Sequence, residues 1–555
     1  MNVLLSFMVS PNRLAGILET AALAEVDAEL STSTLLTTGQ RNEHILAVRA
    51  NHDVLEIVFS MVLDLQGGTG LRTVSQVCQK WRRVALDTPL LWRKALNLFV
   101  GTTWMLEMLR CTMDVPLNIC ISGQDIHMGV VYANLSSIAD FFWRFEMLDI
   151  DAPYPQITEF FSFVPFDRSD APRLRTLSLC GQSGHDLSEH NEDLPAELLS
   201  LCAPNLERLS LEDCPFDWEI LKCGLLHSTI RLSVLHIFYS AEGDTPHILS
   251  VSSLLEALAL ITSLQELRLK NVLKINENPF IEMVTPTIMF PALRTLDLQA
   301  SIEFCASFLN GVLMPMLTEL DVECNTMAET SDTPVYMTSA LMIGISAAVS
   351  RNLHDILTVI HHKRKFWILL RSRQTGAFCR VLVRRVNDSP TLENILQRLA
   401  NMPSVHGTEI LHIDLSKYVR DKIAGAVWEH FFERLNNVVF LNFGKYLVPR
   451  ILQTLYRNAK GAVEVQEQGK KVTILLPLLQ TITVLASPNL CILADMIGEL
   501  RETVGAPIDR FGMFRKTDSD LAVQDHITAW LEGNVTNAPI DDVEESTEEP
   551  EDFGG

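Results

Sequence analysis

Alternating leucines repeat along the middle of the chain. The spacing Leu-x-x-Leu-x-Leu or a close variant occurs six times between residues 174 and 322, and the central leucines lie 32, 26, 32, 29 and 24 residues apart. Alternation places every second side chain on one face of a strand, so each copy predicts one short strand whose leucines point inward. The copies are Leu174-Leu177-Leu179, Leu206-Leu209-Leu211, Leu232-Leu235-Ile237, Leu264-Leu267-Leu269, Leu293-Leu296-Leu298 and Leu317-Leu320-Val322, with a weaker one at Phe145-Leu148-Ile150.

The segments between these strands predict helices. Residues 248–261 carry Leu254, Leu255 and Leu258 at helical spacing. Repetition at this period indicates a solenoid, in which each strand buries its leucines against the next repeat. A generic α/β domain with leucine-rich strands is the alternative. Proline often precedes the strand, as expected where a helix ends before a strand begins, at Pro172, Pro204, Pro291 and Pro315.

The second copy extends to the leucine-rich-repeat consensus. Cys214 follows Leu211 at the position that this consensus gives to Asn or Cys, and Phe216 completes the pattern. Asn325 takes the same place after Val322. At roughly 1.5–3 kcal/mol for each fully buried leucine, such repeats form a core without a cofactor.

The regular spacing is lost between residues 328 and 408 and returns less regularly afterwards. Residues 366–370 and 377–383 predict two strands joined by a turn that contains Gly376. Residues 490–504 predict a closing helix, which would cap the array. The later strand copies are Ile410-Ile413-Leu415, Val438-Leu441-Phe443 and Leu479-Ile482-Val484.

Residues 53–95 predict a small helical unit in front of the repeats. Apolar residues recur at helical spacing in two runs on either side of the glycine-rich stretch 67–70. Two short apolar faces cannot both be buried inside so small a unit, so one of them is expected to contact another protein. The first run holds Val54, Ile57, Val58, Met61 and Leu65, and the second holds Leu71, Val74, Cys78, Trp81 and Ala85.

The stretch Ser75-Gln76-Val77-Cys78-Gln79-Lys80-Trp81, followed by Thr88-Pro89 and Trp92, resembles an F-box, especially that of fungal, basidiomycete-type F-box proteins. Members of this family use the box to dock on a Skp-type adaptor, which links them to a cullin-RING ubiquitin ligase. The family usually opens with Leu-Pro-x-Glu, whereas residues 50–53 here read Ala-Asn-His-Asp. An ordinary helical hairpin within a larger core is the alternative interpretation.

The resemblance implies a substrate-receptor subunit of an SCF-type cullin-RING ubiquitin ligase, whose box binds the adaptor and whose repeats bind a target protein. The fold class is then α/β: an N-terminal helical F-box-like hairpin followed by an irregular leucine-rich-repeat solenoid of strand-plus-helix repeats. A non-catalytic leucine-rich-repeat scaffold, whose degenerate box no longer binds the adaptor, is the alternative function. The residues expected to contact the adaptor or to form the core of the box are Val54, Leu55, Val58, Phe59, Val74, Val77, Cys78, Trp81 and Trp92.

Composition and pattern together divide the chain into four parts. Residues 1–45 read as a helix and a Ser/Thr-rich linker, and residues 46–98 as the F-box-like domain. Residues 99–530 hold the solenoid with its connector and closing helix. The acidic end, 531–555, buries little apolar surface and is expected to be a disordered tail.

Composition limits which binding partners and which cellular compartment are expected. With 47% hydrophobic and 20% charged residues, most of the 555-residue chain is expected to fold, and its longest apolar stretches are too short to span a membrane. A formal charge of −23 opposes binding to nucleic acid. Eleven cysteines without a Cys-x-x-Cys pair fit buried free thiols in a reducing compartment, the cytoplasm or the nucleus.

Signals for catalysis are few. The stretch 67–70 lacks the Gly-Lys-Ser/Thr ending of a phosphate-binding loop, and His185 and His190 lie in a polar stretch that reads as a loop. We therefore expect no enzyme activity, cofactor or metal; an enzyme within residues 328–408 is a third hypothesis. The basic residues Lys363, Arg364, Lys365, Arg371, Arg373, Arg380, Arg384 and Arg385 form either a solvated strand edge or a docking patch for an acidic or phosphorylated partner.

Overall fold

The chain divides into two compact units. Unit 1 comprises residues 1–352 and 374–386, and unit 2 comprises residues 353–373 and 387–555. The predictions made for 1–45 and 531–555 lie outside the described residues, as do His185, His190, Lys363, Arg364 and Arg385. The computed structural model describes residues 50–122, 129–166, 171–182, 193–239, 251–272, 288–325, 335–362, 365–384, 389–415, 423–443, 449–468, 474–485, 488–508 and 510–514.

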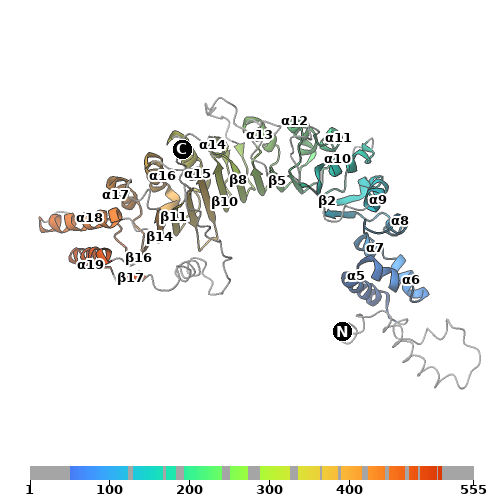
Figure 1. Ribbon diagram of the computed structural model, residues 1–555, viewed down its shortest axis with the longest axis horizontal. Helices are drawn as coiled ribbons and strands as arrows, with labels where there is room; N and C mark the ends of the chain where they lie inside the picture. The colour runs from blue at the N-terminus through green and yellow to red at the C-terminus, as the bar shows by residue number, and fades with distance from the viewer. Residues whose placement is uncertain are drawn as a thin grey trace, which may run out of the picture. The chain divides into compact units, whose positions relative to one another are not determined.

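Helices open the described part of unit 1 (Figure 1). The first of them contains a break at Gly67, whose φ of 61° and ψ of −157° are accessible mainly to glycine. The prediction of one second helix from Leu71 through Ala85 was wrong, because helix α5 ends at Val74 and the chain is extended at Cys78 before the next helix begins. The bounds are α5 (His52–Val74), α6 (Gln79–Leu86), α7 (Pro89–Ala95) and α8 (Thr102–Cys111).

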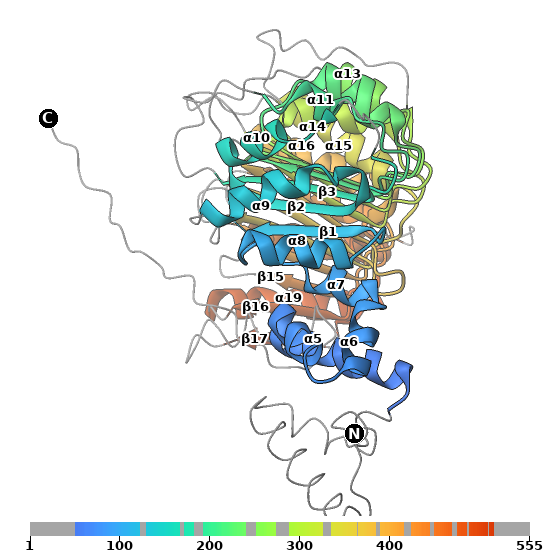
Figure 2. The same cartoon turned by 90° about the vertical axis from the view of Figure 1, so that its right-hand side faces the viewer.

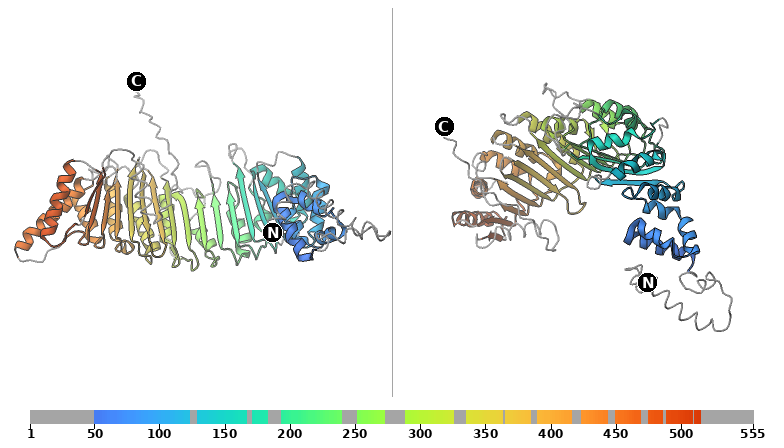
Figure 3. Two further views of the ribbon diagram at one scale, coloured as in Figure 1. Left: turned by 90° about the horizontal axis from the view of Figure 1, so that it is seen from below. Right: turned by 45° about the vertical axis from the view of Figure 1, so that its right-hand side comes forward.

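A parallel sheet forms the body of unit 1, and its strands lie side by side in Figure 3. Every strand expected between residues 145 and 322 is present. The order is β1 (Leu117–Ser122), β2 (Phe145–Pro153), β3 (Thr176–Gln182), β4 (Arg208–Glu212), β5 (Val234–Phe238), β6 (Glu266–Lys270), β8 (Thr295–Ser301), β10 (Glu319–Asn325) and β13 (Phe378–Arg384).

Helical segments connect these strands and lie along one face of the sheet (Figures 1 and 2). The helix expected within 248–261 is present, and a separate short pair joins β7 (Ile288–Met289) to β9 (Val312–Leu313). The helical segments are α9 (Gly129–Ala139), the 3₁₀ turn Phe142–Arg144, α10 (Tyr154–Ser162), α11 (Ala196–Leu199), α12 (Trp218–Leu221), the π-helical turn Lys222–Leu226, α13 (Val251–Leu258), α14 (Ile302–Asn310) and α15 (Val335–Val349).

The repeated leucines form the core of unit 1. Leu209, Leu235 and Leu267 lie beside one another in the parallel register, and each is fully buried. Residues that alternate with them along each strand are exposed or half-buried on the opposite face. We call this opposite face of the unit 1 sheet the open face.

The strands of unit 2 include one antiparallel pair. Strand β11 pairs antiparallel with β12 and parallel with β14, and β15, β16 and β17 continue in parallel. Both strands expected on either side of Gly376 are present, β12 in unit 2 and β13 in unit 1. The elements are β11 (Ile356–His362), β12 (Lys365–Arg371), α16 (Ser389–Ala400), the 3₁₀ turn Pro403–Val405, β14 (Ile410–Leu415), α17 (Gly425–Arg434), β15 (Phe440–Phe443), α18 (Pro449–Glu467), β16 (Thr481–Leu485), α19 (Pro488–Thr503) and β17 (Arg510–Phe514).

Gly224 lies where two helical segments of unit 1 come close together, and a substitution there tests this packing. A Cβ added at Gly224 would lie 2.4 Å from the Leu199 carbonyl oxygen and 2.4 Å from the Ser200 Cα. Because both are backbone atoms, Gly224→Ala should lower the free energy of unfolding by about 1–3 kcal/mol, measured as a lower urea midpoint. Gly101→Ala is the matched control, since a Cβ there meets nothing within 4 Å. Equal midpoints for the two variants would contradict this packing.

The buried side chain of His412 predicts that the stability of unit 2 depends on pH. His412 on β14 is 8% exposed, and burial lowers the pKa of its side chain from 6.5 to about 4. On acidification the unfolded chain therefore takes up a proton at this histidine before the folded chain does. The contribution of His412 to the free energy of unfolding is complete above about pH 6.5 and is lost as the pH drops toward 4, by at most about 3 kcal/mol. The urea midpoint of His412→Gln should fall less between pH 7 and 5 than that of the wild type. An equal fall for this variant and the wild type would show that His412 is not the group responsible.

Candidate functional site

Helix α5 carries two apolar stripes, and only one of them is used by its own unit. At 100° per residue, Leu55, Phe59 and Val62 fall on one side, and they are 0–4% exposed. The other side carries Val54, Ile57 and Leu65, which are 48%, 61% and 64% exposed. Val58 and Met61 lie on this second side and are half-buried. We call Val54, Ile57, Val58, Met61 and Leu65 the outer stripe.

Aromatic side chains fix the core of the box. The Phe59 and Trp81 rings meet edge-to-face with centroids 5.3 Å apart. Trp92 is 2% exposed, and its indole Nε1 donates to the Ala85 carbonyl oxygen at 2.6 Å. Cys78 caps the N-terminus of α6, because its Sγ accepts a hydrogen bond from the Trp81 backbone N–H at 3.4 Å. These contacts close α5, α6 and α7 into one unit.

The residues predicted from the sequence therefore separate into two groups. Leu55, Phe59, Val74, Trp81 and Trp92 are core residues. Val54 and Val77, which are 48% and 53% exposed, and the half-buried Val58 and Cys78 remain available on the surface. Three exposed residues, Ile57, Leu65 and Leu90, were not in the predicted set. The helical spacing of Ile57 and Leu65 with Val54 was the signal that could have added those two.

Helix α5 is, among the described residues, the one long and apolar enough to cross a membrane by length and composition. Its length results from two shorter helices that meet at Gly67. The part before the break, residues 52–66, is about 22 Å long at 1.5 Å per residue, which is less than a hydrocarbon core of about 30 Å. The outer stripe lies on this shorter helix.

A polar joint connects the box to the first strands of the sheet. Arg93 on α7 donates to Asn118 Oδ1 on β1 at 2.7 Å and to Glu146 Oε2 on β2 at 2.5 Å. The Trp92 ring also meets the Trp104 ring of α8, with centroids 5.9 Å apart, and the guanidinium of Arg72 lies 5.2 Å from the Trp104 ring. The box is thus packed against the start of the repeats within unit 1.

The open face presents rows of charged and polar side chains. One row runs across the sheet through His236, Arg268, Asp297, Asp321 and Arg380. Burial, and next the neighbouring Asp321 carboxylate, raises the pKa of Asp297. The adjacent row holds Glu212, Phe238, Lys270, Gln299, Glu323 and Leu382.

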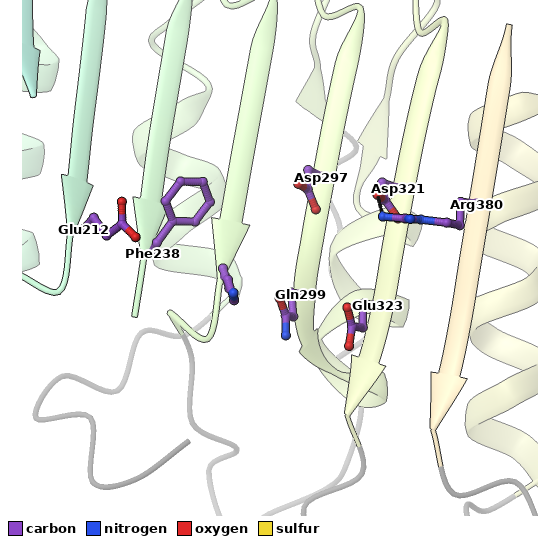
Figure 4. Close-up of a pocket in the computed structure, with 8 residues that line it drawn as sticks. Glu212, Phe238, Asp297, Gln299, Asp321, Glu323 and Arg380 are labelled. Carbon is purple, nitrogen blue, oxygen red and sulfur yellow. Dashed lines mark hydrogen bonds and ion pairs between the residues drawn. The ribbon is translucent and has the colours of Figure 1, made fainter. Parts of the chain in front are cut away.

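These two rows enclose a hollow of about 270 Å³ (Figure 4). Asp321 accepts two hydrogen bonds from Arg380, including one from Nε to Oδ1 at 2.8 Å, and Glu323 is paired with Arg384. Asp297 has no hydrogen-bonding or ion-pair partner within the described part of the chain. The lining residues are Glu212, Phe238, Lys270, Asp297, Gln299, Asp321, Glu323 and Arg380.

Three arginines of the predicted basic run are paired with acids. Arg380 and Arg384 bind Asp321 and Glu323 in unit 1, as above. In unit 2, Arg373 is paired with Asp355 and with Glu409, the latter at 2.6 Å. The charge of these three arginines is therefore offset locally, which weakens the hypothesis of a docking patch for a phosphorylated partner.

The described cysteines are free thiols of differing exposure. Cys111, Cys214, Cys305, Cys324 and Cys379 are buried. The expectation of buried thiols does not hold for all of them, because Cys120, Cys202 and Cys223 are exposed. No group of three or more His, Cys, Asp or Glu residues placed to hold a metal ion is found where the structure describes the chain.

Comparison with known proteins agrees with the box. Residues 52–97 match the F-box-like family. None of the curated proteins matches the chain. The solved leucine-rich repeat-containing protein LegL7 from Legionella pneumophila is 15% identical, with a TM-score of 0.24, over 63% of this chain and 97% of that one.

The domain match and the fold together define the class of protein. The chain carries an F-box-like domain, followed by a sheet rich in parallel strands with helices, which is a mixed α/β fold consistent with a leucine-rich-repeat-like solenoid. The domain ends at residue 97, just before the connector helix α8.

The buried core of the box and the outer stripe of α5 predict different effects of substitution on stability. Trp81→Ala should lower the free energy of unfolding by about 3–5 kcal/mol, because a large buried ring is removed. Ile57→Ala should change it by less than about 0.5 kcal/mol, because the side chain is 61% exposed. Urea denaturation of the two variants beside the wild type measures both, and a large loss for Ile57→Ala would show that the outer stripe is part of the core.

Proposed function

We propose that this protein is a substrate-receptor subunit of an SCF-type cullin-RING ubiquitin ligase. In this role the box binds a Skp-type adaptor and the repeats bind a target protein. The outer stripe of α5 is the observation that supports adaptor binding most directly. A folded box with its core already filled leaves Ile57 and Leu65 more than 60% exposed on one side of the helix. Exposed apolar rows of this kind mark protein-binding surfaces.

The absence of the Leu-Pro-x-Glu segment that usually opens an F-box is compatible with binding to the adaptor. In place of Leu-Pro-x-Glu, the chain reads Ala-Asn-His-Asp at residues 50–53. The Ala50 carbonyl oxygen accepts a hydrogen bond from Lys80 Nζ at 2.8 Å, which attaches this segment to α6. The exposed Val77 lies in the turn just before the same helix. Adaptor contact in this protein would then rest more on the outer stripe than on the opening loop.

The receptor acts by proximity. Binding of the adaptor and the target by one chain raises the effective concentration of the target near the ubiquitin-conjugating enzyme, so the receptor itself makes and breaks no bond. The joint between α7 and the first two strands suits this role, because Arg93 ties the box to the sheet through two hydrogen bonds. No enzyme activity, cofactor or metal is part of the proposal, and the cytoplasm or the nucleus is the proposed compartment.

A scaffold whose box does not bind the adaptor is the second candidate. It is favoured by the altered opening at residues 50–53. Such a protein would keep the repeats as a binding surface and would lack any link to ubiquitin transfer. Direct binding to the adaptor distinguishes the two functions.

The double variant Ile57→Asp, Leu65→Asp should weaken binding to purified Skp-type adaptor by about 100-fold or more. The charges would be buried without partners in the complex, whereas they remain solvated in the free protein. Isothermal titration calorimetry on the full chain measures the affinity, and circular dichroism measures the fold. Leu260→Asp is the matched control, since this leucine is 54% exposed outside the box and should not affect binding.

If the wild type binds and both variants bind equally well, the outer stripe is not the docking surface. If the folded wild type does not bind the adaptor, the ligase role is abandoned in favour of the scaffold.

A further inference from the structure

The strands of unit 2 have a face that is more apolar than the open face of unit 1. Along β12, Phe366, Ile368 and Leu370 are at most 1% exposed and fill the core, and the residues that alternate with them point to the opposite side. The register continues this opposite side across β11, β14 and β15. We call it the apolar face of unit 2, and its apolar residues are Ile356, Ile360, Trp367, Leu369, Ile410 and Phe440.

Burial distinguishes the apolar face of unit 2 from the open face of unit 1. The open-face residues of β4, β5 and β6 are exposed or half-buried. On the apolar face, Ile356 and Ile410 are each 2% exposed and Thr358 is 3% exposed. Residues buried on both sides of a strand are typical of strands that carry a further layer of structure on each side. Figure 1 shows α16 and α17 together on one side of these strands, so the apolar face needs a covering element of its own.

Two buried polar atoms on the apolar face lack a hydrogen-bond partner. Thr358 on β11 and His412 on β14 are neighbours in the parallel register. Neither Thr358 Oγ1 nor His412 Nδ1 makes a hydrogen bond among the described residues. Burial lowers the pKa of His412 to about 4, so its side chain is neutral near pH 7. A buried polar atom without a partner is unfavourable, so this face suits an occupant that is mainly apolar and carries a few polar groups.

The segment after the last described strand has a matching sequence pattern. Strand β17 lies at the end of the strand order, and residues 515–532 follow it directly. Within them, four apolar residues recur at i, i+4, i+7 and i+8, which is the spacing of one helix face. At 100° per residue, Asp525 and Glu532 fall on the side opposite to this row. We call the row the C-terminal stripe, and it consists of Val523, Ile527, Trp530 and Leu531.

Chain length and position allow this segment to reach the apolar face. Strand β17 is separated from β14 by β16 and β15, which places β17 and β14 about 14 Å apart. The eight residues 515–522 between β17 and the C-terminal stripe span up to about 26 Å when extended. Because the segment and the face belong to one chain, the effective concentration of the segment is on the order of millimolar, which favours it over a dilute partner of equal affinity.

We propose that residues 521–532 dock on the apolar face of unit 2 through the C-terminal stripe and act as its intramolecular ligand. The stripe supplies the apolar surface that covers Ile410 and Trp367. Trp530 also brings an indole N–H, which is a donor for an unpartnered atom such as His412 Nδ1. A target protein gains this face only by displacing the segment, so the free protein presents the open face of unit 1 for binding. The inference does not rest on the proposed function.

Photocrosslinking in the full chain tests this contact. The photoreactive amino acid p-benzoylphenylalanine is introduced in place of Trp530, the protein is irradiated, and mass spectrometry identifies the crosslinked residues. Crosslinks should fall on β11, β12, β14 or β15 of the same molecule. The same probe in place of Phe553, beyond the stripe, is the control and should give no such crosslinks. A mixture of isotope-labelled and unlabelled protein distinguishes crosslinks within one molecule from crosslinks between two.

Matched variants connect the crosslink to the C-terminal stripe. Ile527→Asp places a charge in the stripe and should lower the yield of the crosslink from position 530 about 10-fold or more, because burying an unpaired charge is unfavourable. Val535→Asp places the same charge outside the stripe and should leave the yield unchanged. Without the probe, hydroxyl-radical oxidation of Trp367 should rise in Ile527→Asp and stay at the wild-type level in Val535→Asp. Circular dichroism confirms that each variant is folded.

Several results would overturn the intramolecular contact. These are crosslinks that fall elsewhere in the chain, equal yields for Ile527→Asp and Val535→Asp, or oxidation of Trp367 that does not change in Ile527→Asp. Crosslinks between labelled and unlabelled molecules would overturn it in favour of a second copy on the apolar face. Adaptor binding has no part in these measurements, so the failure of the proposed function leaves this inference standing, and the reverse also holds.

Discussion

The burial of leucines between neighbouring strands is the interaction on which unit 1 depends. A single repeat contributes one short strand, whose inward residues would be exposed if it stood alone. The parallel register places Leu235 between Leu209 and Leu267, so each leucine is shielded by the repeats on either side. Stability is therefore shared along the array and belongs to no single repeat. The helices on the other side of these leucines complete the core, which is why one face of the sheet stays open.

This arrangement leaves two surfaces free for binding, and they differ in chemistry. The outer stripe of the box is apolar, and its helix α5 fills the core of the box with the opposite stripe. The open face is polar and charged, because its side chains alternate with the buried leucines along each strand. An apolar row suits a stable partner that stays bound, and a charged face suits a partner selected by the position of its charges.

Ion pairs across strands organise that open face. Arg380 and Arg384 on β13 lie next to Asp321 and Glu323 on β10, so the charges of these neighbouring strands cancel in part. Strand β13 comes more than fifty residues after β10 in the sequence and joins it only through the fold. Asp297, one strand further from β13, lacks such a paired arginine, and burial raises the pKa of its carboxyl group, although Arg268 and Arg380 act in the opposite direction. The distribution of compensated and uncompensated charge on this face is thus set by strand order.

The sequence alone determined the repeated strands, the connecting helices and the presence of the box. Strand periodicity is local, so the spacing of Leu296 and Leu298 is sufficient to predict a strand with an inward face. The sequence of residues 53–95 also indicated that the box has more apolar surface than it can bury. It did not determine which stripe of α5 is buried, because Leu55 and Ile57 are both apolar and only the packing of Phe59 against Trp81 decides between the stripes. The hollow on the open face was likewise beyond the sequence, since Phe238, Asp297 and Arg380 are brought together by the register of strands that are far apart in the chain.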